Sequence, residues 1–147
     1  MNTMITMTLP AEIRYVRLAS LTAAKVAEIF SASFTAADNA DGFCHAFELS
    51  VSEAFTNAVR YAVSSDQENM VTINFKGDRN RLTVSVSDSN PPFDPEFPSP
   101  DINSYPESGF GLLLIRRLMD TVTYTREDGR NLISMTKQPD NQRFGNL

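Results

Sequence analysis

The sequence is poor in the residues that build disulfides and transition-metal sites, because it holds one cysteine and one histidine. Cys44 has no partner for an intrachain disulfide, and a lone cysteine is typical of a reducing compartment. We interpret Cys44 as a small buried hydrophobic residue. His45 lacks a second histidine or a cysteine pair nearby, so we interpret it as structural or surface-exposed.

Long apolar runs and an excess of basic residues are also absent. The longest apolar run, Leu112–Ile115, is far too short to cross a membrane. The first residues lack the basic flank and long apolar core of a secretory signal. The net charge is -5 and the pI is about 4.8, which argues against nucleic acid as a primary partner. We therefore expect a cytoplasmic protein that binds neither membranes nor nucleic acid.

The remaining composition is that of an ordinary globular domain. The chain has 147 residues, of which 41% are hydrophobic and 21% are charged. This length is enough to bury one hydrophobic core, so we expect a single domain over residues 1–147.

Hydrophobic periodicity predicts three helices and five strands. The alternation at 13–18 predicts a first strand, which we expect at the edge of the sheet, and we expect Ser20 to cap the helix that follows. The other expected elements are a helix from about 43 to 63, strands at 71–76 and 81–87, a helix from about 109 to 120, and a hairpin of 121–126 and 131–137. This order predicts an α+β fold, a mixed and mainly antiparallel sheet with helices on one face.

A proline-rich segment interrupts this pattern after the second predicted hairpin strand. Six of the eight prolines fall between Pro91 and Pro106, which excludes a helix or a central strand there. A loop of this length inside a compact domain is usually functional and is often a lid.

Glu53 and Asn57 are the first pair of residues that point to chemistry. They are four positions apart, so they share one stripe of the second predicted helix, next to its apolar stripe. An asparagine carbonyl suits a hard cation such as Mg²⁺, and a carboxylate one turn away can accept the proton of an attacking hydroxyl. Taken alone, the pair also fits a solvated helix face.

Asp88 ends an apolar strand face that also carries Leu82, Val84 and Val86. A carboxylate in such a row is costly unless it accepts hydrogen bonds, and the exocyclic amino group of adenine is a suitable donor. The alternative is a turn-forming aspartate.

Gly109 and Gly111 flank Phe110 at the expected start of the third helix. Glycine allows close approach of the backbone to a phosphate, and a helix N-terminus supplies free N–H groups. The glycines also fit a simple transition from loop to helix.

Taken together, three blocks resemble a known family. Glu53-Ala-Phe-Thr-Asn57-Ala-Val-Arg-Tyr looks like the N-box of the GHKL ATP-binding superfamily. Asp88-Ser-Asn-Pro-Pro-Phe-Asp-Pro95 looks like its first glycine box, and Ser108-Gly-Phe-Gly-Leu-Leu-Leu-Ile115 like its second. The stretches LSVSEAFTNAVRYA and GFGLLLIRRLMDTVTY are similar to the anti-sigma-factor serine/threonine kinases of the RsbW and SpoIIAB type.

The resemblance implies a Bergerat-type ATP-binding sandwich and a role for each matching residue. Glu53 is then the general base that activates a serine or threonine hydroxyl of a partner, and Asn57 ligates the Mg²⁺ on the ATP phosphates. Asp88 binds the adenine amino group, with Thr136 assisting. The resemblance also assigns nucleotide binding to the glycine-box residues Phe93, Gly109, Phe110 and Gly111, with residues 95–107 as the lid.

The resemblance further implies two protein partners and an assembly. The phosphoacceptor is expected to be a STAS-domain antagonist, and the second partner a sigma factor. Partner switching then follows nucleotide state and antagonist phosphorylation, usually in a homodimer. We expect the dimer contact at the edge strand near 13–18.

Three positions depart from the family pattern. Asn90 stands at the usual glycine of the first box, and asparagine is the residue that best tolerates a left-handed backbone after glycine. Ser108 opens the second box where glycine is common, and Tyr61 stands where the family often has histidine. None of the three changes the residues assigned to the base, the metal or adenine, so we expect ATP binding to persist.

The residues leave other functions open. The changes at Asn90 and Ser108 also fit a regulator that binds its partners with or without nucleotide and transfers no phosphate. The ATP-binding half of a histidine kinase acting in trans fits the boxes, but no separate helix carries a phosphoacceptor histidine. A gyrase- or chaperone-like ATPase is less favoured, since no transducer domain follows.

Overall fold

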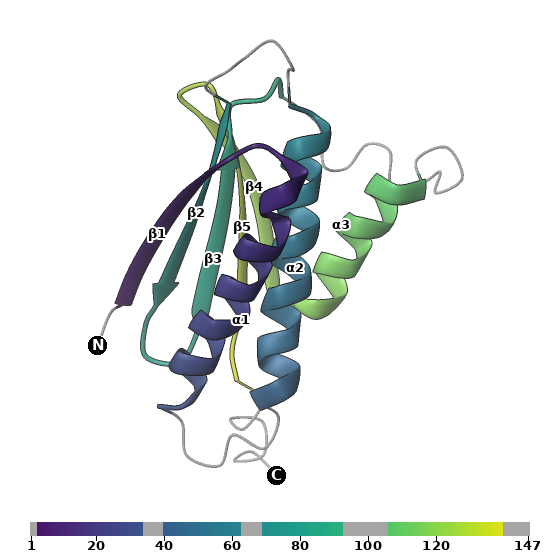
Figure 1. Ribbon diagram of the computed structural model, residues 1–147. Helices are drawn as coiled ribbons and strands as arrows, with labels where there is room; N and C mark the ends of the chain where they lie inside the picture. Colours follow the sequence, from purple (N-terminus) through teal and green to yellow (C-terminus); the bar gives the residue numbers. More distant parts are fainter. Residues whose placement is uncertain (1–2, 34–39, 63–68, 93–105, 140–147) are drawn as a thin grey trace.

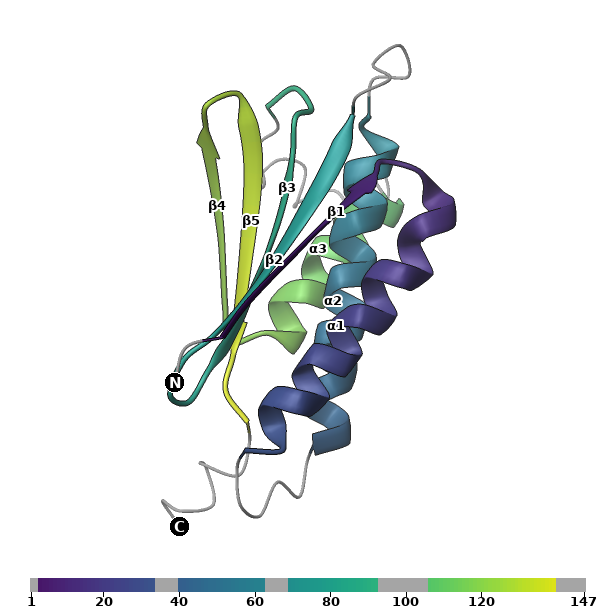
Figure 2. The same cartoon turned by 60° about the vertical axis from the view of Figure 1, so that its left-hand side comes forward.

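The structure is a computed structural model that describes residues 3–33, 40–62, 69–92 and 106–139. Within these residues, a five-stranded sheet carries three α-helices on one of its faces (Figures 1 and 2). In the part of the chain that is described, no helix is long and apolar enough to span a membrane. Phe93 and most of the expected lid at 95–107 lie outside the described residues.

The elements follow one another in an α+β order. They are β1 (Thr3–Pro10), a 3-10 turn η1 (Ile13–Tyr15), α1 (Val16–Ser31), α2 (Ala40–Arg60), β2 (Met70–Gly77), β3 (Leu82–Asp88), α3 (Pro106–Leu118), β4 (Thr121–Glu127) and β5 (Arg130–Lys137). The strand order is β1-β2-β3-β5-β4, and each neighbouring pair is antiparallel. The predicted α+β fold, a mixed and mainly antiparallel sheet with helices on one face, is confirmed in its layers, and every strand pair within the described residues is antiparallel.

The prediction of a first strand at 13–18 is wrong. Residues 13–15 form η1 and α1 begins at Val16, whereas the first strand is Thr3–Pro10. Six residues of alternating polarity are too few to separate a strand from the start of a helix. Ser20 does not cap α1 but lies buried within it, where its hydroxyl donates to the Arg17 carbonyl at 3.4 Å.

The other helices begin earlier than predicted. α2 runs over 40–60 instead of about 43–63, and α3 begins at Pro106 instead of near Gly109. Proline favours the first turn of a helix because its missing N–H would have no partner there. Gly109 and Gly111 therefore lie inside α3 and do not open it.

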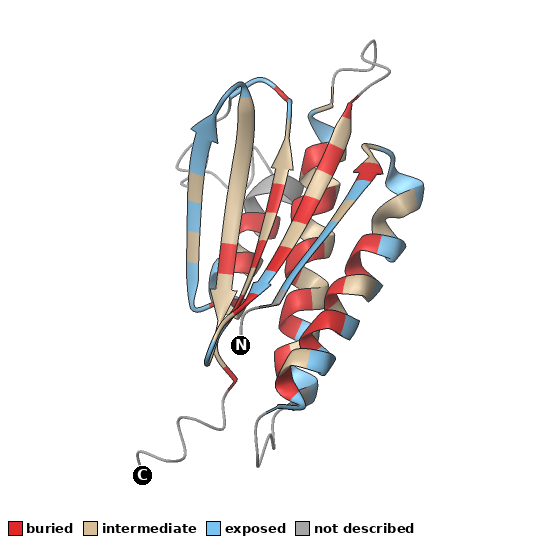
Figure 3. Ribbon diagram, turned by 90° about the vertical axis from the view of Figure 1, so that its left-hand side faces the viewer, coloured by how far each residue is buried: buried red, intermediate tan, exposed pale blue. Residues whose placement is uncertain are grey.

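α2 is the central element of the helical layer, because it packs between α1 and α3 and against the sheet (Figure 1). Its fully buried face carries Phe43, Phe47, Val51 and Phe55. The rings of Phe43 and Phe47 pack edge to face, with their centroids 5.0 Å apart. Opposite them, alternate residues of the central strands point into the same core, which Figure 3 shows as alternating buried positions. These strand residues are Val71, Ile73, Phe75, Leu82, Val84, Val86 and Met135.

The other face of the sheet carries hydroxyl and amide side chains. Cross-strand pairs join Thr8 to Thr72, Thr83 to Thr136 and Ser85 to Ser134 at 2.9–3.2 Å. The amide of Asn74 also donates to the Thr6 hydroxyl at 2.7 Å. These side chains face solvent, because no described element covers them (Figure 3).

Removing an α2 core ring tests the packing of this layer. We expect Phe47→Ala to lower the free energy of unfolding by about 3–5 kcal/mol, since the lost ring leaves a cavity between α1, α2 and the sheet. Ile29→Ala is the control, because this α1 side chain is 63% exposed and its loss should change stability by no more than about 0.5 kcal/mol. Urea denaturation measures both. Equal effects of the two substitutions would contradict the described core.

Candidate active site

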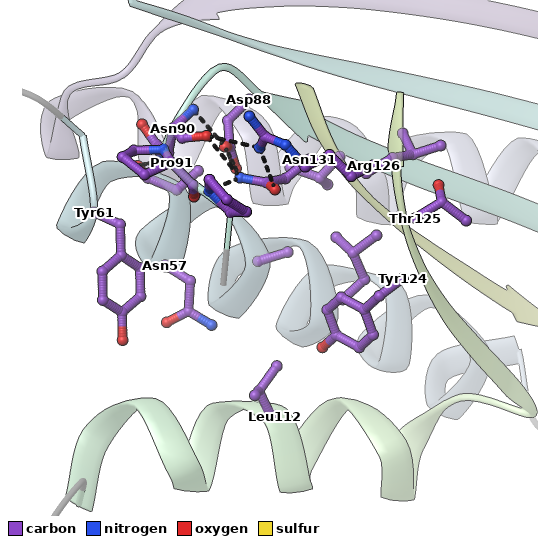
Figure 4. Close-up of a pocket in the computed structure, with 16 residues that line it drawn as sticks. Asn57, Tyr61, Asp88, Asn90, Pro91, Leu112, Tyr124, Thr125, Arg126 and Asn131 are labelled. Carbon is purple, nitrogen blue, oxygen red and sulfur yellow. Dashed lines mark hydrogen bonds between the residues drawn. The ribbon is translucent and has the colours of Figure 1, made fainter. Parts of the chain in front are cut away.

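A cavity of about 390 Å³ lies between α2, α3, the end of β3 and the β4–β5 hairpin. Its lining residues are Ala54, Asn57, Ala58, Tyr61, Val86, Asp88, Asn90, Pro91, Pro92, Leu112, Tyr124, Thr125, Arg126, Asn131, Leu132 and Ile133. Most of the wall is apolar, and the polar groups gather at a few points (Figure 4). Such a cavity suits a small ligand with a flat apolar body and a few polar groups.

Asp88 provides the carboxylate at one end of this cavity. It is the last residue of β3 and lies opposite Asn131 of β5 in the sheet register. Its Oδ1 accepts the Asn90 backbone N–H at 3.0 Å and an Asn131 side-chain N–H at 3.0 Å. These bonds stabilise a carboxylate at the end of an apolar strand face, as the sequence pattern required.

Asn90 does not adopt the left-handed backbone that its place in the glycine box suggested. Among the described residues, Asp128 is the only non-glycine residue with a positive φ. Asn90 is instead 3% exposed, and its side chain donates to the Ala58 carbonyl at 2.9 Å and accepts from Asn69 at 3.3 Å. The side chain therefore joins the end of β3 to the last turns of α2.

Arg126 and Asn131 are site residues that the sequence patterns did not indicate. Arg126 Nη1 donates to Asn131 Oδ1 at 2.9 Å and to the Asn90 carbonyl at 3.1 Å. The Asn131 amide also lies 3.1 Å from that carbonyl and 3.2 Å from the Pro91 carbonyl. The only sequence signal was the Asp128-Gly129 turn, which sets the hairpin register but does not say which strand the hairpin joins.

Glu53 and Asn57 lie on the stripe of α2 that faces α3. Asn57 lines the cavity, and Figure 4 shows its amide between α2 and α3. Glu53 is half-buried one turn away and is not among the lining residues. A Cβ on Gly111 would lie 2.7 Å from Glu53 Oε2 and 3.8 Å from Asn57 Nδ2. A larger residue at position 111 would therefore force the Glu53 carboxylate to move from its present place.

The glycine segment of the second box lies in the first turns of α3. Gly109 and Phe110 are the fourth and fifth helical residues, and Gly111 is the sixth. In an α-helix the first four N–H groups have no intrahelical partner. The backbone N–H groups of α3 that have no intrahelical acceptor therefore belong to its first turn and not to Gly111.

Thr136 does not lie with the other predicted site residues. It is on β5, five positions after Asn131, and side chains alternate between the two faces of a strand. Its hydroxyl pairs with Thr83 at 2.9 Å on the face of the sheet away from the helices. It is not among the residues that line the cavity.

A second, shallower groove lies between α1 and α2, away from this cavity. Cys44 and His45 line it together with Lys25, Glu28 and other residues. Burial raises the pKa of the Cys44 thiol, which keeps it protonated and unreactive at neutral pH. No group of three histidine, cysteine or carboxylate side chains that could hold a metal occurs within the described ranges.

Solved structures share this fold. The histidine kinase domain of the Erythrobacter litoralis EL346 blue-light activated histidine kinase superposes with a TM-score of 0.54. The superposition covers 71% of this chain and 48% of that one, at 20% sequence identity. The likeness therefore concerns the fold alone.

Sequence comparisons identify the family. The model of the histidine kinase-like ATPase domain matches residues 9–137. The serine-protein kinase RsbW of Bacillus subtilis is 32% identical, over 95% of this chain and 88% of the relative. RsbW of Listeria innocua is 31% identical over 93% and 88%, and RsbW of Staphylococcus epidermidis is 34% identical over 90% and 85%. The chain thus belongs to the RsbW family of serine-protein kinases, and residues 9–137 form its histidine kinase-like ATPase domain.

Proposed function

We propose that this protein is an ATP-dependent serine/threonine kinase and anti-sigma factor, which phosphorylates a STAS-domain antagonist and sequesters a sigma factor by partner switching. One observation carries the proposal: the cavity has the Asp88 carboxylate at one end and reaches Asn57, one turn from Glu53, on α2. The RsbW relatives, which match over most of their length, support it.

Adenine is the group that best fits the Asp88 end of the cavity. Val86, Leu112 and Ile133 offer apolar surface for a flat ring. The Asp88 carboxylate can accept a hydrogen bond from the 6-amino group of adenine, which satisfies the remaining need of a half-buried carboxylate. We propose that no direct contact with Thr136 is involved, since that residue lies on the other face of the sheet.

The phosphates then extend toward α2 and the first turn of α3. The backbone N–H groups of that turn, which have no intrahelical acceptor, suit an anion. Mg²⁺ commonly takes only one or two protein oxygens together with phosphates and water, so the single Asn57 carbonyl fits it as a protein ligand. When bound, Mg²⁺ would neutralise phosphate charge as the phosphoryl group transfers.

Glu53 is suited to accept the proton of the attacking hydroxyl. The hydroxyl oxygen of the partner would bond to the γ-phosphorus while its proton passes to the Glu53 carboxylate, and ADP would leave with the electrons of the broken phosphorus–oxygen bond. Glu53 lies beside the cavity, one helical turn from Asn57 and not within the wall.

The partners and the assembly complete the proposal. We propose that residues 1–147 act as one ATP-binding domain, in the cytoplasm, as a homodimer. The edge strand β1 supports a dimer contact, because it offers unpaired backbone groups and its Met4 side chain is 65% exposed. This strand replaces the segment 13–18 as the expected contact.

Asp88→Asn tests the adenine site. The substitution removes a carboxylate acceptor and brings an N–H donor toward the amino group, so ADP affinity should fall by about 10- to 150-fold, the equivalent of about 1.5–3 kcal/mol. Calorimetric titration of the purified protein with Mg-ADP and Mg-ATP measures it. Asp78→Asn is the matched control, since Asp78 lies in the β2–β3 turn outside the cavity lining. Equal affinities of the two variants would exclude Asp88 as the base-recognition residue.

Glu53→Gln tests the chemistry. Loss of the general base should reduce phosphate transfer from ATP to the STAS-domain partner by about 100-fold or more, with ATP affinity nearly unchanged. Glu48→Gln is the control on the same helix, because Glu48 lines the separate groove toward α1. Transfer at the wild-type rate in Glu53→Gln rules out Glu53 as the base. If the wild type transfers no phosphate but binds its partners in a nucleotide-dependent way, the protein is a regulator without kinase activity.

Gly111→Ala tests the contact between α3 and Glu53. Alanine in place of a helix glycine normally stabilises by about 1 kcal/mol, but here its Cβ would clash with Glu53 Oε2. We expect Gly111→Ala to stabilise the protein more in a Glu53→Ala background than in the wild type, and to disturb phosphate transfer in the wild-type background because the Glu53 carboxylate is displaced. A double-mutant cycle by urea denaturation measures the coupling. Additive effects of the two substitutions would mean that the side chains do not meet.

A further inference from the structure

We propose that Asn131 determines the base selectivity of the nucleotide pocket. Together with the Asn90 backbone N–H, its amide fills both lone-pair sites of Asp88 Oδ1 and leaves Oδ2 as the acceptor, which fits the one-donor edge of adenine and not the two-donor edge of guanine. The inference rests on the proposed function, because it requires a purine nucleotide in the cavity. Figure 4 shows Asp88, Asn90, Arg126 and Asn131 together at one end of that cavity.

The hydrogen bonds to Asp88 are concentrated on one oxygen. Both the Asn90 backbone N–H and the Asn131 amide donate to Oδ1, each at 3.0 Å. Within the part of the chain that the structure describes, Oδ2 is the oxygen that these bonds leave for a ligand. The strand register places the two residues directly opposite each other on β3 and β5, so the contact is a consequence of sheet pairing.

A carboxylate can recognise purines in two ways. With both oxygens available, it can accept two adjacent N–H donors, which the N1 and 2-amino groups of guanine supply. Adenine presents one donor, its 6-amino group, beside the N1 acceptor. A carboxylate whose Oδ1 is already occupied therefore loses its advantage for guanine and keeps its bond to adenine.

Arg126 fixes the direction in which the Asn131 amide points. A guanidinium group has only donors, so the atom of Asn131 at 2.9 Å from Arg126 Nη1 must be the amide oxygen. The amide nitrogen is then directed to Asp88 and to the carbonyls of Asn90 and Pro91. Arg126 also donates to the Asn90 carbonyl at 3.1 Å, which holds the turn after β3 against the hairpin. Asn131 is thus a positioning residue for Asp88, and Arg126 orients it.

The test compares ADP with GDP in the full-length protein. Calorimetric titrations of the wild type should show tighter binding of ADP. In Asn131→Ala the ratio of ADP affinity to GDP affinity should fall by about tenfold, the value of one hydrogen bond to a charged group. The matched control is Asn74→Ala, which removes an asparagine side chain with a 2.7 Å hydrogen bond from the open face of the same sheet and should leave the ratio unchanged.

Arg126 variants separate positioning from a loss of folding. Arg126 is exposed on the hairpin, so its removal should leave the fold intact. Arg126→Ala should reduce the ADP-to-GDP ratio by a smaller factor than Asn131→Ala, because the amide can then rotate. Arg126→Lys should restore part of the selectivity, since an ammonium group also donates to the amide oxygen. Thermal denaturation without nucleotide checks that each variant is folded.

The outcomes distinguish this inference from the proposed function. If the wild type binds neither ADP nor ATP, the proposed function fails and the inference fails with it. If Asp88→Asn weakens ADP binding but Asn131→Ala leaves the ratio unchanged, the inference alone is overturned. Equal losses of ADP and GDP binding in Asn131→Ala would also overturn it, because they would indicate a purely structural role. A wild type that binds GDP as tightly as ADP contradicts it directly.

Discussion

The packing of α2 against the sheet is the interaction on which the rest of the structure depends. Phe47, Val51 and Phe55 are fully buried there, and burying each such side chain is worth about 1.5–3 kcal/mol. Side chains of a helix are offset by roughly 100° per residue, so a fixed apolar face also fixes the direction of Glu53 and Asn57. The burial that stabilises the domain is therefore the same burial that orients the polar stripe beside the cavity.

Strand register is the second constraint, and it acts on the other end of the cavity. Asp88 and Asn131 meet because β3 and β5 pair in a register that places them opposite each other. A slip of one residue would turn Asn131 to the open face and bring Arg130 or Leu132 to its place. The Arg130 guanidinium opposes such a slip, because it donates a 3.1 Å hydrogen bond to the Ser87 carbonyl of β3 that a shifted register would not keep. Helix periodicity and strand register thus build the two ends of the site independently.

Local patterns in the sequence were enough for most of the fold and for one part of the site. The α+β order, the strands β2 and β3 and the Glu53–Asn57 stripe follow from hydrophobic periodicity. Asp88 follows from its place at the end of an apolar strand face. The first strand was missed because a short alternation at 13–18 competes with helix formation there. Asn131, Arg126 and the buried role of Asn90 were not predictable, since each depends on contacts between elements far apart in the chain. The place of Thr136 on the opposite face follows from the alternation of side chains along β5, where its neighbour Met135 is fully buried.

The open face of the sheet has a different kind of consequence. Its threonines, serines and asparagine are uncharged, and β-branched threonine favours extended backbone without needing a partner layer. The strands can therefore hold their shape with only one side packed. Residues there can be exchanged for other small polar ones at little cost, so this surface is where the sequence has most freedom to diverge while the buried side remains constrained.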